Sequence, residues 1–404
     1  GGGAAQRTVL LCVTGCIAAY KSCEILRLLQ KQGYRVKVLM TEHATQFMGP
    51  TTFRALTHEK VAIGLFDDPE DPIHHISLAQ EADAVLVAPA TANIIAKMAN
   101  GIADDLMSTT LLATDAPVFV APAMNAGMLR AAATQENLER LRQRGVTLIA
   151  PGTGYLACGT VDAGRLEEPH IIAQTVVDAL EATDELSGLH VLVTAGPTHE
   201  PIDPVRYIAN RSSGKMGYAI AREARRMGAR VTLVTGPTEL PLPTGVEIRS
   251  VETAAQMHDA ATSVFQDADI AICAAAVADY TPTHVADRKL KKRDGGLDTI
   301  QLAETSDILA ALSSSKGNRV VVGFAAETND LIDNARAKLA SKGCDAIVAN
   351  DVSRKDSGFG TDTNKAWWLD EQGADELPVL DKHELAREIL HRAGLRARKD
   401  FSRS

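Results

Sequence analysis

A single cysteine stands in a glycine-rich stretch where packing does not account for it. Residues 152–159 read GTGYLACG, and the three glycines, with no helix or strand periodicity, predict a loop. A side chain in such a loop buries little surface, so the thiol of Cys158 is a candidate for chemistry. A loop cysteine without a role is the alternative, and the other motifs of the chain decide between the two.

Three further motifs in the first half could form a site for a flat, phosphorylated ligand. TGCIAAYK (14–21) places Gly15, which lets the backbone approach a ligand, before a helix that begins at Ile17 and offers free N–H groups. The motif suits one phosphate and is not GxGxxG, so a mononucleotide such as FMN is favoured over a dinucleotide, with a plain tight turn as the alternative. PATAN (89–93) and PAMN (122–125) each combine a proline-fixed turn with small residues and an asparagine, and a ring could lie against them.

Two adjacent histidines, His74 and His75 in PIHHIS, precede the helix that leads into the third predicted strand. A histidine at a strand-end crevice can act as a base near neutral pH. A structural role is the commoner one for a lone histidine, and only one of this pair needs to take part in chemistry.

The stretch GPTHEPIDPVRYIANRSSGKMG (196–217) carries the phosphate signal of the second half. It is not a P-loop, because GxxxxGK[ST] requires Ser or Thr after the lysine and Met216 stands there. Glycines and hydroxyls before a helix still form a phosphate cradle. Capping of that helix by Ser212 or Ser213 is a compatible alternative.

Charged and aromatic residues follow the later strands of the second half. Asp279 ends AAAVADY, and Phe324 in GFAAET stands where it could touch a base. Lys338 and Lys342 are four residues apart on a predicted helix, so both ammonium groups lie on one face, where they could meet a polyphosphate. The basic run in DRKLKKRDGG (287–296) could meet a small anionic ligand, although a charge run is usually solvated surface.

All of these motifs fall at or just beyond the carboxyl end of a predicted strand, where open α/β sheets bind their ligands. β-Branched runs alternate with helix-periodic stretches along nearly the whole chain, which predicts an α/β protein. We expect two tandem doubly wound, Rossmann-like domains with mainly parallel sheets. The predicted strands are 8–14, 35–41, 82–90, 117–123 and 146–152 in the first half, and 190–196, 229–236, 268–276, 318–326 and 344–351 in the second.

A polar segment that ends in a glycine, EATDELSG, separates the two halves, and the strand-helix pattern begins again after it. We therefore expect a first domain over 1–180, a linker over 181–189 and a second domain over 190–404. A length of 404 residues agrees with two or three compact units.

Composition excludes several classes of protein. A hydrophobic share of 45% with 23% charged residues is that of a globular protein, and no apolar run approaches the roughly 20 residues that span a bilayer. The formal charge of −9 argues against a nucleic-acid partner. The start, GGGAAQR, lacks the features of a signal peptide, so a cytoplasmic location is expected by default. The six cysteines form no CxxC pair, so we expect free thiols, with neither a disulfide framework nor a zinc site.

Six ordered motifs of the first half resemble the flavin-dependent cysteine decarboxylases, in the branch that acts on 4′-phosphopantothenoylcysteine. The motifs are TGCIAAYK, the HI of 75–76, PATAN, DLMSTTLLAT, PAMNAGM and GTGYLACG, and the resemblance covers nearly all of residues 7–180. The chain departs from the family pattern at Cys16, where Gly or Ser is common, and at Leu129, where an aromatic residue is usual. The second departure could change the wall of the substrate pocket.

The resemblance implies a flavodoxin-like FMN domain and assigns a role to Cys158. In this family the substrate thiol is oxidised to a thioaldehyde, carbon dioxide leaves, and the resulting double bond is reduced. Cys158 would be the proton donor for that reduction, on a loop that closes over the intermediate and excludes water. His75 would assist oxidation and decarboxylation, and Asn125 would hold the substrate carboxylate. The implied FMN contacts are Gly15, Cys16, Ile17, Thr41, Pro89, Ala90, Thr91, Asn93, Ser108 and Met124.

The second half, over about residues 188–390, resembles the bacterial, CTP-using phosphopantothenate–cysteine ligases, and the fused order is that of a bifunctional enzyme of coenzyme A biosynthesis. In this family CTP and a divalent metal such as Mg²⁺ convert the pantothenate carboxylate to an acyl-cytidylate, and the amine of cysteine displaces CMP. The resemblance implies that Asn210 orients the acyl group and that Lys289, on a loop expected to be mobile until substrate arrives, meets the triphosphate. The implied CTP contacts are Ser212, Gly214, Lys215, Ala274, Ala275, Ala276, Asp279, Lys289, Ser306, Asp307, Ile308, Leu309, Phe324, Lys338 and Lys342.

The partners implied by the resemblance are small molecules and copies of the same chain: ligase-domain dimers formed through the region of DPVRYIAN, and decarboxylase-domain trimers, in bacteria commonly within a dodecamer. The preference for CTP over ATP comes from the resemblance alone, and the metal ligands stay unknown.

Two alternative functions stay open. One is a flavin decarboxylase of another cysteine-containing substrate fused to a nicotinamide-dependent reductase, which the absence of GxGxxG after 190–196 disfavours. The other is a silent regulatory homologue, which the presence of His75, Asn125 and Cys158 does not support.

Overall fold

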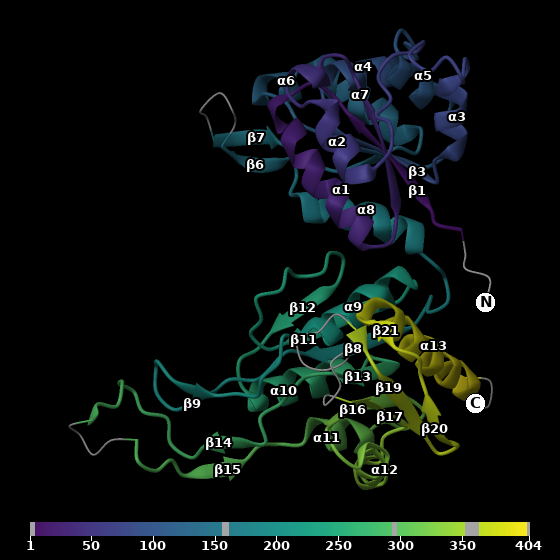
Figure 1. Ribbon diagram of the computed structural model, residues 1–404. Helices are drawn as coiled ribbons and strands as arrows, with labels where there is room; N and C mark the ends of the chain where they lie inside the picture. The colour runs from purple at the N-terminus through teal and green to yellow at the C-terminus, as the bar shows by residue number, and fades with distance from the viewer. Residues whose placement is uncertain (1–4, 156–160, 293–296, 352–362, 402–404) are drawn as a thin grey trace. The chain divides into compact units, whose positions relative to one another are not determined.

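The computed structural model describes residues 5–155, 161–292, 297–351 and 363–401. The chain divides into two compact units, Gly1–Glu181 and Ala182–Ser404 (Figure 1). Both are α/β units built mainly on parallel sheets, so the predicted fold class is confirmed. Each unit is described by itself below.

The first unit holds a five-stranded parallel sheet in the order β2-β1-β3-β4-β5. This order is that of flavodoxin-like sheets, in which successive strands are first added on one side of the first strand and then, from the third strand on, on its other side. The strands are β1 (Thr8–Val13), β2 (Arg35–Met40), β3 (Ala84–Ala90), β4 (Val118–Pro122) and β5 (Thr147–Leu148). The five predicted strands are thus present, although the last is much shorter than its predicted range of 146–152, because the chain leaves the sheet at Ile149.

Helices cover both faces of this sheet, which explains why its strands read as continuous apolar runs. The side chains of one face pack with η1, α1, α2 and α8, and those of the other face pack with α3, α4, α5 and α7. The bounds are η1 (Ile17–Lys21), α1 (Ser22–Lys31), η2 (Ala44–Gln46), α2 (Pro50–Thr57), α3 (His74–Glu81), α4 (Ala92–Asn100), α5 (Leu106–Ala113), α6 (Ala126–Arg130), α7 (Ala132–Gln143) and α8 (Pro169–Glu181).

The second unit holds an eight-stranded sheet in the order β12-β11-β8-β13-β16-β17-β19-β20. Its first six strands are parallel, and β19 and β20 add an antiparallel edge. The strands are β8 (His190–Ala195), β11 (Arg230–Thr235), β12 (Glu247–Ser250), β13 (Ile270–Cys273), β16 (Val320–Glu327), β17 (Ala346–Asp351), β19 (Ala366–Asp370) and β20 (Gly373–Glu376). The sequence predicted the five central strands and missed the three at the edges.

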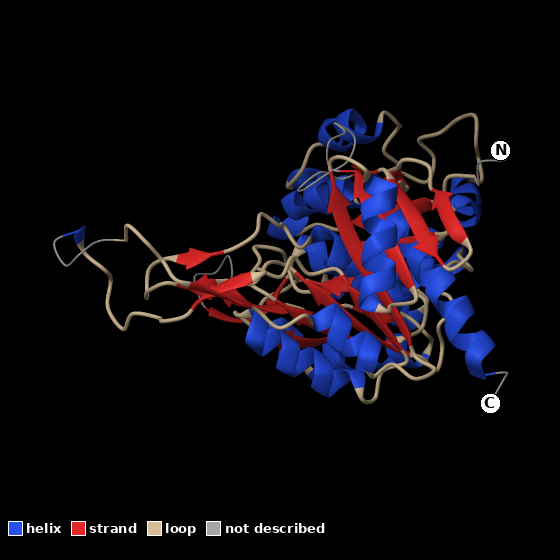
Figure 2. Ribbon diagram, turned by 90° about the horizontal axis from the view of Figure 1, so that it is seen from below, coloured by secondary structure: helices blue, strands red, loops and turns tan. Residues whose placement is uncertain are grey.

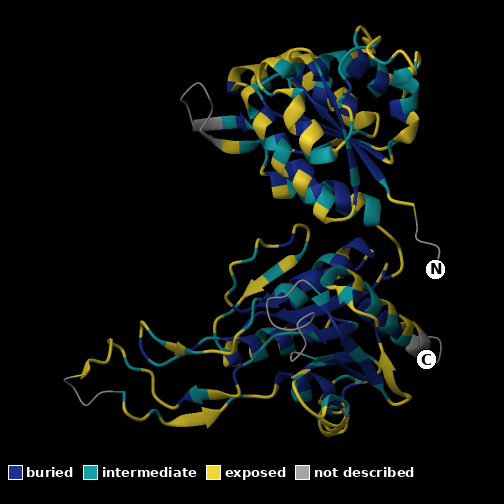
Figure 3. Cartoon of the chain, viewed as in Figure 1, coloured by how far each residue is buried: buried dark blue, intermediate teal, exposed yellow. Residues whose placement is uncertain are grey.

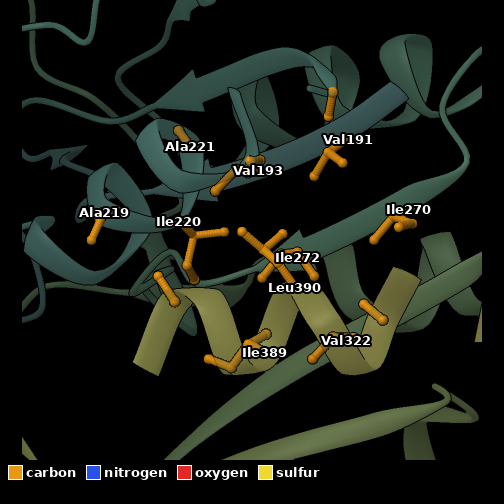
Figure 4. Packing of buried hydrophobic residues seen from close by; sticks show 14 of the residues in the cluster. Val191, Val193, Ala219, Ile220, Ala221, Ile270, Ile272, Val322, Ile389 and Leu390 are labelled. Carbon is orange, nitrogen blue, oxygen red and sulfur yellow. The ribbon is translucent and has the colours of Figure 1, made fainter. Parts of the chain in front are cut away.

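Two layers of helices enclose this sheet too. Helices α9 (Lys215–Arg226) and α13 (Lys382–Phe401) cover one face, and α10 (Ala254–Phe265), α11 (Ile308–Ser314) and α12 (Leu331–Lys342) cover the other. Figure 4 shows the first of these layers, where Val191 and Val193 of β8 lie near Ile220 of α9 and Ile389 and Leu390 of α13. Dark blue central strands in Figure 3 mark the buried core of each unit.

Short antiparallel ribbons extend from the strand ends of the second unit. Two of them, β9 with β10 and β14 with β15, reach away from the main sheet (Figures 1 and 2). A third pairs β18 with β21 beside the start of α13. The bounds are β9 (Glu200–Pro201), β10 (Tyr207–Ile208), β14 (Tyr280–Pro282), β15 (Leu302–Glu304), β18 (Thr363–Asn364) and β21 (Leu380–Asp381). Among the described residues, none of the helices combines the length and apolarity that crossing a bilayer requires.

Candidate functional sites

A cavity of about 640 Å³ opens at the carboxyl ends of β1, β2 and β3 in the first unit. Its volume is within the range of small-molecule sites, and its place at the reversal point of the strand order is where such sheets bind ligands. Gly15 lies in the turn that follows β1 and lines this cavity. A Cβ added at Gly15 would come within 2.6 Å of His43 Cβ. A glycine is therefore required for this close approach of two loops.

Four of the ten predicted FMN contacts line this cavity together: Gly15, Thr41, Thr91 and Asn93. Two of these residues also shape the local backbone, since Thr91 caps α4 by accepting a hydrogen bond from the Ile94 amide and Thr41 Oγ1 accepts one from the Ala44 amide at 3.1 Å. The other six lie in the same segments or next to other lining residues. Cys16 and Ile17 follow Gly15, Pro89 and Ala90 end β3, Ser108 lies one residue beyond Met107 of the lining, and Met124 follows β4.

Asn125 stands at the end of β4, where it caps α6 by accepting a hydrogen bond from the Gly127 amide at 2.8 Å. Its neighbour Met124 donates its amide to the Gly164 carbonyl at 2.9 Å, which ties this strand end to the ribbon of β6 and β7. Gly164 has φ +120°, and a Cβ added there would approach the Met124 carbonyl oxygen to 2.3 Å. Cys158 belongs to residues 156–160, which lie outside the described part of the chain.

The expectation that residues 152–159 contain no regular structure is wrong for the start of that stretch. β6 (Gly152–Tyr155) pairs antiparallel with β7 (Val161–Arg165), with a register shift between Gly152 and Thr153. The strand was not predicted because glycines carry no side chains, so the alternation that marks a strand in sequence is missing.

The two histidines lie at the first turn of α3, and both are half-buried. His74 Nδ1 lies 3.6 Å from the carboxylate of Asp71. His75 is not among the residues that line the 640 Å³ cavity. The structure therefore brings four of the mononucleotide-type residues together, and His75 lies outside the lining of their cavity.

Two adjoining cavities open at the carboxyl ends of the second sheet, of about 390 and 460 Å³. They share Ala275, Val277, Asp279, Phe324 and Lys338, so they form one continuous site. The smaller cavity also holds Ser306, Asp307, Ile308, Leu309 and Lys342. The larger one also holds Asn210, Ser212, Gly214, Lys215, Ala274 and Ala276. All of the predicted CTP contacts except Lys289 thus line one or both cavities.

The helix that follows the phosphate cradle is capped by a glycine rather than by a serine. Capping of the following helix by Ser212 or Ser213 was the alternative that the sequence offered, but the N-cap of α9 is Gly214, in the left-handed conformation with φ 78° and without a side-chain cap. The two hydroxyls instead accept longer hydrogen bonds, of 3.3 Å, from the amides two residues on. Glycine is needed because a Cβ at Gly214 would approach Thr238 Cγ2 to 2.8 Å.

Two lysines of α12 face the shared site with different surroundings. Lys338 is half-buried and donates to the Phe324 carbonyl at 2.6 Å; burial, followed by the charge of Lys342, lowers its pKa. Lys342 forms an ion pair with Asp307. Burial opposes the charged form of this carboxyl, but the hydrogen bond from Lys342 outweighs burial, so the pKa of Asp307 is lowered. An anionic ligand near these lysines would favour the protonated form of Lys338.

Asn210 and Lys289 occupy different environments. Asn210 Nδ2 donates to the Val277 carbonyl at 3.0 Å, which fixes its amide beside the larger cavity. Lys289 is exposed on the loop after β14 and lines neither of the two cavities. The residue after it is anchored, because the Leu290 amide donates to Asp203 Oδ2 at 3.1 Å and its carbonyl accepts from Arg206 Nη2 at 2.8 Å.

Sequence reasoning missed several residues of these sites. Asn350, Asn364 and Lys382 line the larger cavity, and they come from β17, β18 and α13. No motif marks them in the sequence; Lys382, for example, opens an amphipathic helix, where a lysine is usually a surface residue.

Cys273 lines the smaller cavity, and burial raises its pKa to about 12, so it is a neutral thiol there. Within the described ranges, no three His, Cys, Asp or Glu side chains gather as metal ligands do.

Comparison with known proteins matches both units to family models. Residues 3–181 match the family described as Flavoprotein, and residues 186–394 match the DNA/pantothenate metabolism flavoprotein C-terminal domain. The chain is 48% identical over 404 residues to the coenzyme A biosynthesis bifunctional protein CoaBC of Bacillus subtilis (strain 168), with 99% of both chains covered. This chain belongs to the CoaBC family. It is therefore a bifunctional enzyme of coenzyme A biosynthesis, with a decarboxylase unit that is a flavoprotein and a ligase unit, and the predicted family is confirmed.

The match extends to other members of the family. The CoaBC protein of Escherichia coli (strain K12) is 46% identical over 390 residues, with 96% of both chains covered. Among solved structures, a C-terminal domain of a CoaBC protein is 42% identical and covers 53% of this chain and 97% of its own, with a TM-score of 0.46. A mutant PPC decarboxylase complexed with pantothenoylaminoethenethiol is 30% identical and covers 44% of this chain and all of its own, with a TM-score of 0.40.

Proposed function

We propose that this chain couples cysteine to 4′-phosphopantothenate through an acyl-cytidylate made from CTP, and then decarboxylates the product to 4′-phosphopantetheine with FMN. One observation carries the proposal: a chain whose whole length matches the CoaBC family has, in each unit, a strand-end cavity lined by residues implied for that family's ligands. The domain limits of 1–180 and 190–404 form part of the proposal.

In the ligase unit, the continuous site supports activation of a carboxylate by a nucleoside triphosphate. A carboxylate oxygen bonds to the α-phosphorus and pyrophosphate leaves; the amine of cysteine then attacks the acyl carbon and CMP leaves. Lys215 and Lys338 would offset the charge of the phosphates, while Phe324 lies where both cavities meet and would contact the base. Asn210, held by the Val277 carbonyl, would orient the acyl group.

We propose that Mg²⁺ enters this site with CTP. Magnesium is commonly bound through substrate phosphates and one or two carboxylates rather than by a cage of protein ligands. Asp279 lines both cavities and Asp307 the smaller one, so either carboxylate could complete the coordination of a phosphate-bound ion.

In the decarboxylase unit, the residues of the 640 Å³ cavity fit a flavin mononucleotide. Gly15 lines the cavity directly before η1, whose first amides could bind a phosphate, and Thr91 and Asn93 follow the neighbouring strand β3 at the same edge of the sheet. FMN, when bound, would supply the two-electron chemistry of the oxidation and the later reduction. Asn125, fixed by the Gly127 amide, would hold the substrate carboxylate, His75 would assist its loss, and Cys158 would donate the proton that completes the reduction.

We also propose that the chain acts as a homo-oligomer, with ligase-unit dimers and decarboxylase-unit trimers. The ribbons β9–β10 and β14–β15 support a dimer surface, because they carry exposed apolar side chains away from the main sheet. Val205, Tyr207, Tyr280 and Leu302 are each between 45% and 58% exposed.

An anaerobic assay of the full chain tests the proposal. We would incubate it with 4′-phosphopantothenate, cysteine, magnesium and either CTP or ATP, and follow the products by mass spectrometry and the flavin by visible absorbance. CMP and 4′-phosphopantetheine formed with CTP would support both halves. A bound flavin without amide formation with either nucleotide would refute the ligase half alone.

The Cys158→Ser variant tests the assigned proton donor. We expect carbon dioxide to be released still and an unsaturated intermediate, two hydrogens lighter than 4′-phosphopantetheine, to accumulate. Cys23→Ser, on α1, is the control and should form the normal product. Normal product formation by Cys158→Ser would remove Cys158 from the mechanism.

A further inference from the structure

A lysine from the last helix of the chain lies in the wall of the larger ligase cavity. Lys382 is the first residue of α13, is half-buried, and lines the 460 Å³ cavity together with Leu385. The same cavity is lined by Ser212 and Lys215 at the start of α9. Residues of the last helix and of the phosphate cradle thus line one cavity, although about two fifths of the chain separates them in sequence.

The side chain of Lys382 is oriented by a buried amide. Its Nζ donates to Oδ1 of Asn364 at 2.8 Å. Asn364 is 3% exposed and itself lines the cavity from β18. A buried amide oxygen that accepts from an ammonium group holds the cation in one position in the cavity wall.

Helix α13 begins at a fixed place because a buried carboxylate joins it to α9. Glu223 is 1% exposed; it accepts hydrogen bonds from His383 and, at 2.7 Å, from Arg387 Nε, both on α13. Arg226 Nη1 lies 2.5 Å from the same carboxylate. Burial raises the pKa of Glu223, but the hydrogen bond from His383 and the charge of Arg226 outweigh it, so the carboxylate is charged. The two helices therefore hold Lys382 and the cradle in one rigid arrangement.

The charge of the cavity wall favours a polyanion. Among the described residues, its lining includes four cationic side chains, Arg211, Lys215, Lys338 and Lys382, and one carboxylate, Asp279. An excess of positive charge inside a partly enclosed site attracts phosphate groups more strongly than the same charges on an open surface.

We propose that Lys382, oriented by Asn364, binds a phosphate group of a ligase substrate. The proposal rests on the function proposed above and adds a residue to it. The phosphate could be a terminal phosphate of CTP, which leaves as pyrophosphate, or the 4′-phosphate of phosphopantothenate. Both are multiply charged anions that a lysine recognises by the same charge-assisted hydrogen bonds.

Steady-state kinetics of the full chain with Lys382→Met distinguish these sources. Loss of a charge-assisted hydrogen bond should raise the KM of the substrate concerned by about tenfold or more. A higher KM for CTP with weaker inhibition by inorganic pyrophosphate would assign the nucleotide phosphates. A higher KM for 4′-phosphopantothenate, with pyrophosphate inhibition unchanged, would assign the 4′-phosphate. Unchanged KM values and unchanged inhibition would overturn the proposal.

Two controls separate binding from structural support. Lys316 forms an ion pair with Asp345 at 3.0 Å and does not line either cavity, so Lys316→Met should leave both KM values unchanged. Lys382→Arg keeps the charge and should retain most of the affinity, even if Lys382→Met unfolds the ligase unit. Equal KM changes in Lys316→Met and Lys382→Met, or no difference between Lys382→Arg and Lys382→Met, would also overturn the proposal.

Calorimetry with inorganic pyrophosphate and magnesium tests Lys382 without turnover. If the wild-type chain fails to couple cysteine with CTP, the proposed function fails, yet pyrophosphate binding to the wild type and its loss in Lys382→Met would still support a phosphate site. Equal pyrophosphate binding by the two proteins would refute a site for the nucleotide phosphates, and equal binding of 4′-phosphopantothenate as well would refute the site whatever the reaction.

Discussion

At the scale of single residues, a glycine joins the candidate catalytic segments of the decarboxylase unit. Gly164 lies on β7, the strand that follows the segment of Cys158, and accepts a hydrogen bond from the amide next to Asn125. Its left-handed backbone and the 2.3 Å approach to the Met124 carbonyl oxygen leave no space for a Cβ. Because both partners are backbone atoms, a larger residue cannot be accommodated by rotating a side chain.

We therefore expect Gly164→Ala to displace the β6–β7 ribbon from the end of β4. Decarboxylation of supplied 4′-phosphopantothenoylcysteine should fall at least about tenfold, since misplacing a catalytic group by about 1 Å can cost a hundredfold in rate. Ligase activity of the same protein should be unchanged. Gly145→Ala is the matched control, because Gly145 also has a positive φ, of 89°, but a Cβ there would meet no atom within 4 Å. Equal decarboxylation rates in the two variants would contradict this prediction.

At the scale of elements, a buried carboxylate holds the loop that carries Lys289. The Asp203 side chain is fully buried and accepts hydrogen bonds from the amides of Val205, Arg206 and Leu290. The hydrogen bond from the Arg206 guanidinium, with these amides, holds the pKa of Asp203 well below its usual range. The segment between β9 and β10 is thus fastened to the basic loop at the position next to Lys289.

Asp203→Asn should loosen this loop, because a neutral amide accepts fewer and weaker hydrogen bonds than a carboxylate. We expect the ligase kcat to fall by about ten- to a hundredfold, with decarboxylation unchanged. Rates measured with saturating CTP and with limiting CTP show whether positioning of Lys289 affects catalysis, binding or both. Asp259, whose side chain is 86% exposed, gives the control variant Asp259→Asn. Ligase kinetics that are the same in the two variants would show that Asp203 does not position this loop.

At the scale of the whole molecule, residues just before the second sheet belong structurally to the ligase unit. Leu186 is 0% exposed and Leu189 is 7% exposed, and both lie in the core cluster formed by α9 and α13. The Leu186 amide donates to the Met227 carbonyl at 2.8 Å. Two leucines of the stretch 181–189 are therefore packed in the ligase unit, although most of the residues around them are exposed, and the contact division of the chain falls between Glu181 and Ala182.

A ligase fragment that starts at residue 182 should accordingly be more stable than one that starts at residue 190. Removing Leu186 and its packing should lower the free energy of unfolding by about 2–3 kcal/mol, the value of burying one large aliphatic side chain. Urea unfolding of both fragments measures this difference, and the full-length Leu186→Ala variant provides an independent check. Equal stability of the two fragments would indicate that residues 182–189 act only as a tether.

Much of the fold was predictable because its signals are local. Apolar runs such as TVLLCV predict buried parallel strands, and Gly33 ends the first helix with φ 88° as its position suggests. The edge strands β12 and β20 were missed because they are short and exposed, so their residues lack the apolar pattern of a strand. The ribbon strand β6 was missed because it is rich in glycine.

The sequence by itself determined the α/β class, the family and the residues that follow the strands, because βα turns place such residues at one edge of a sheet whatever the details of packing. Only the tertiary structure decided which of them share a cavity and what else enters it. Lys382 and Asn364 reach the phosphate cradle, and Asp203 reaches the loop of Lys289, through contacts between segments more than 80 residues apart. Such contacts depend on how helices and ribbons pack on the sheet, which no local pattern of residues encodes.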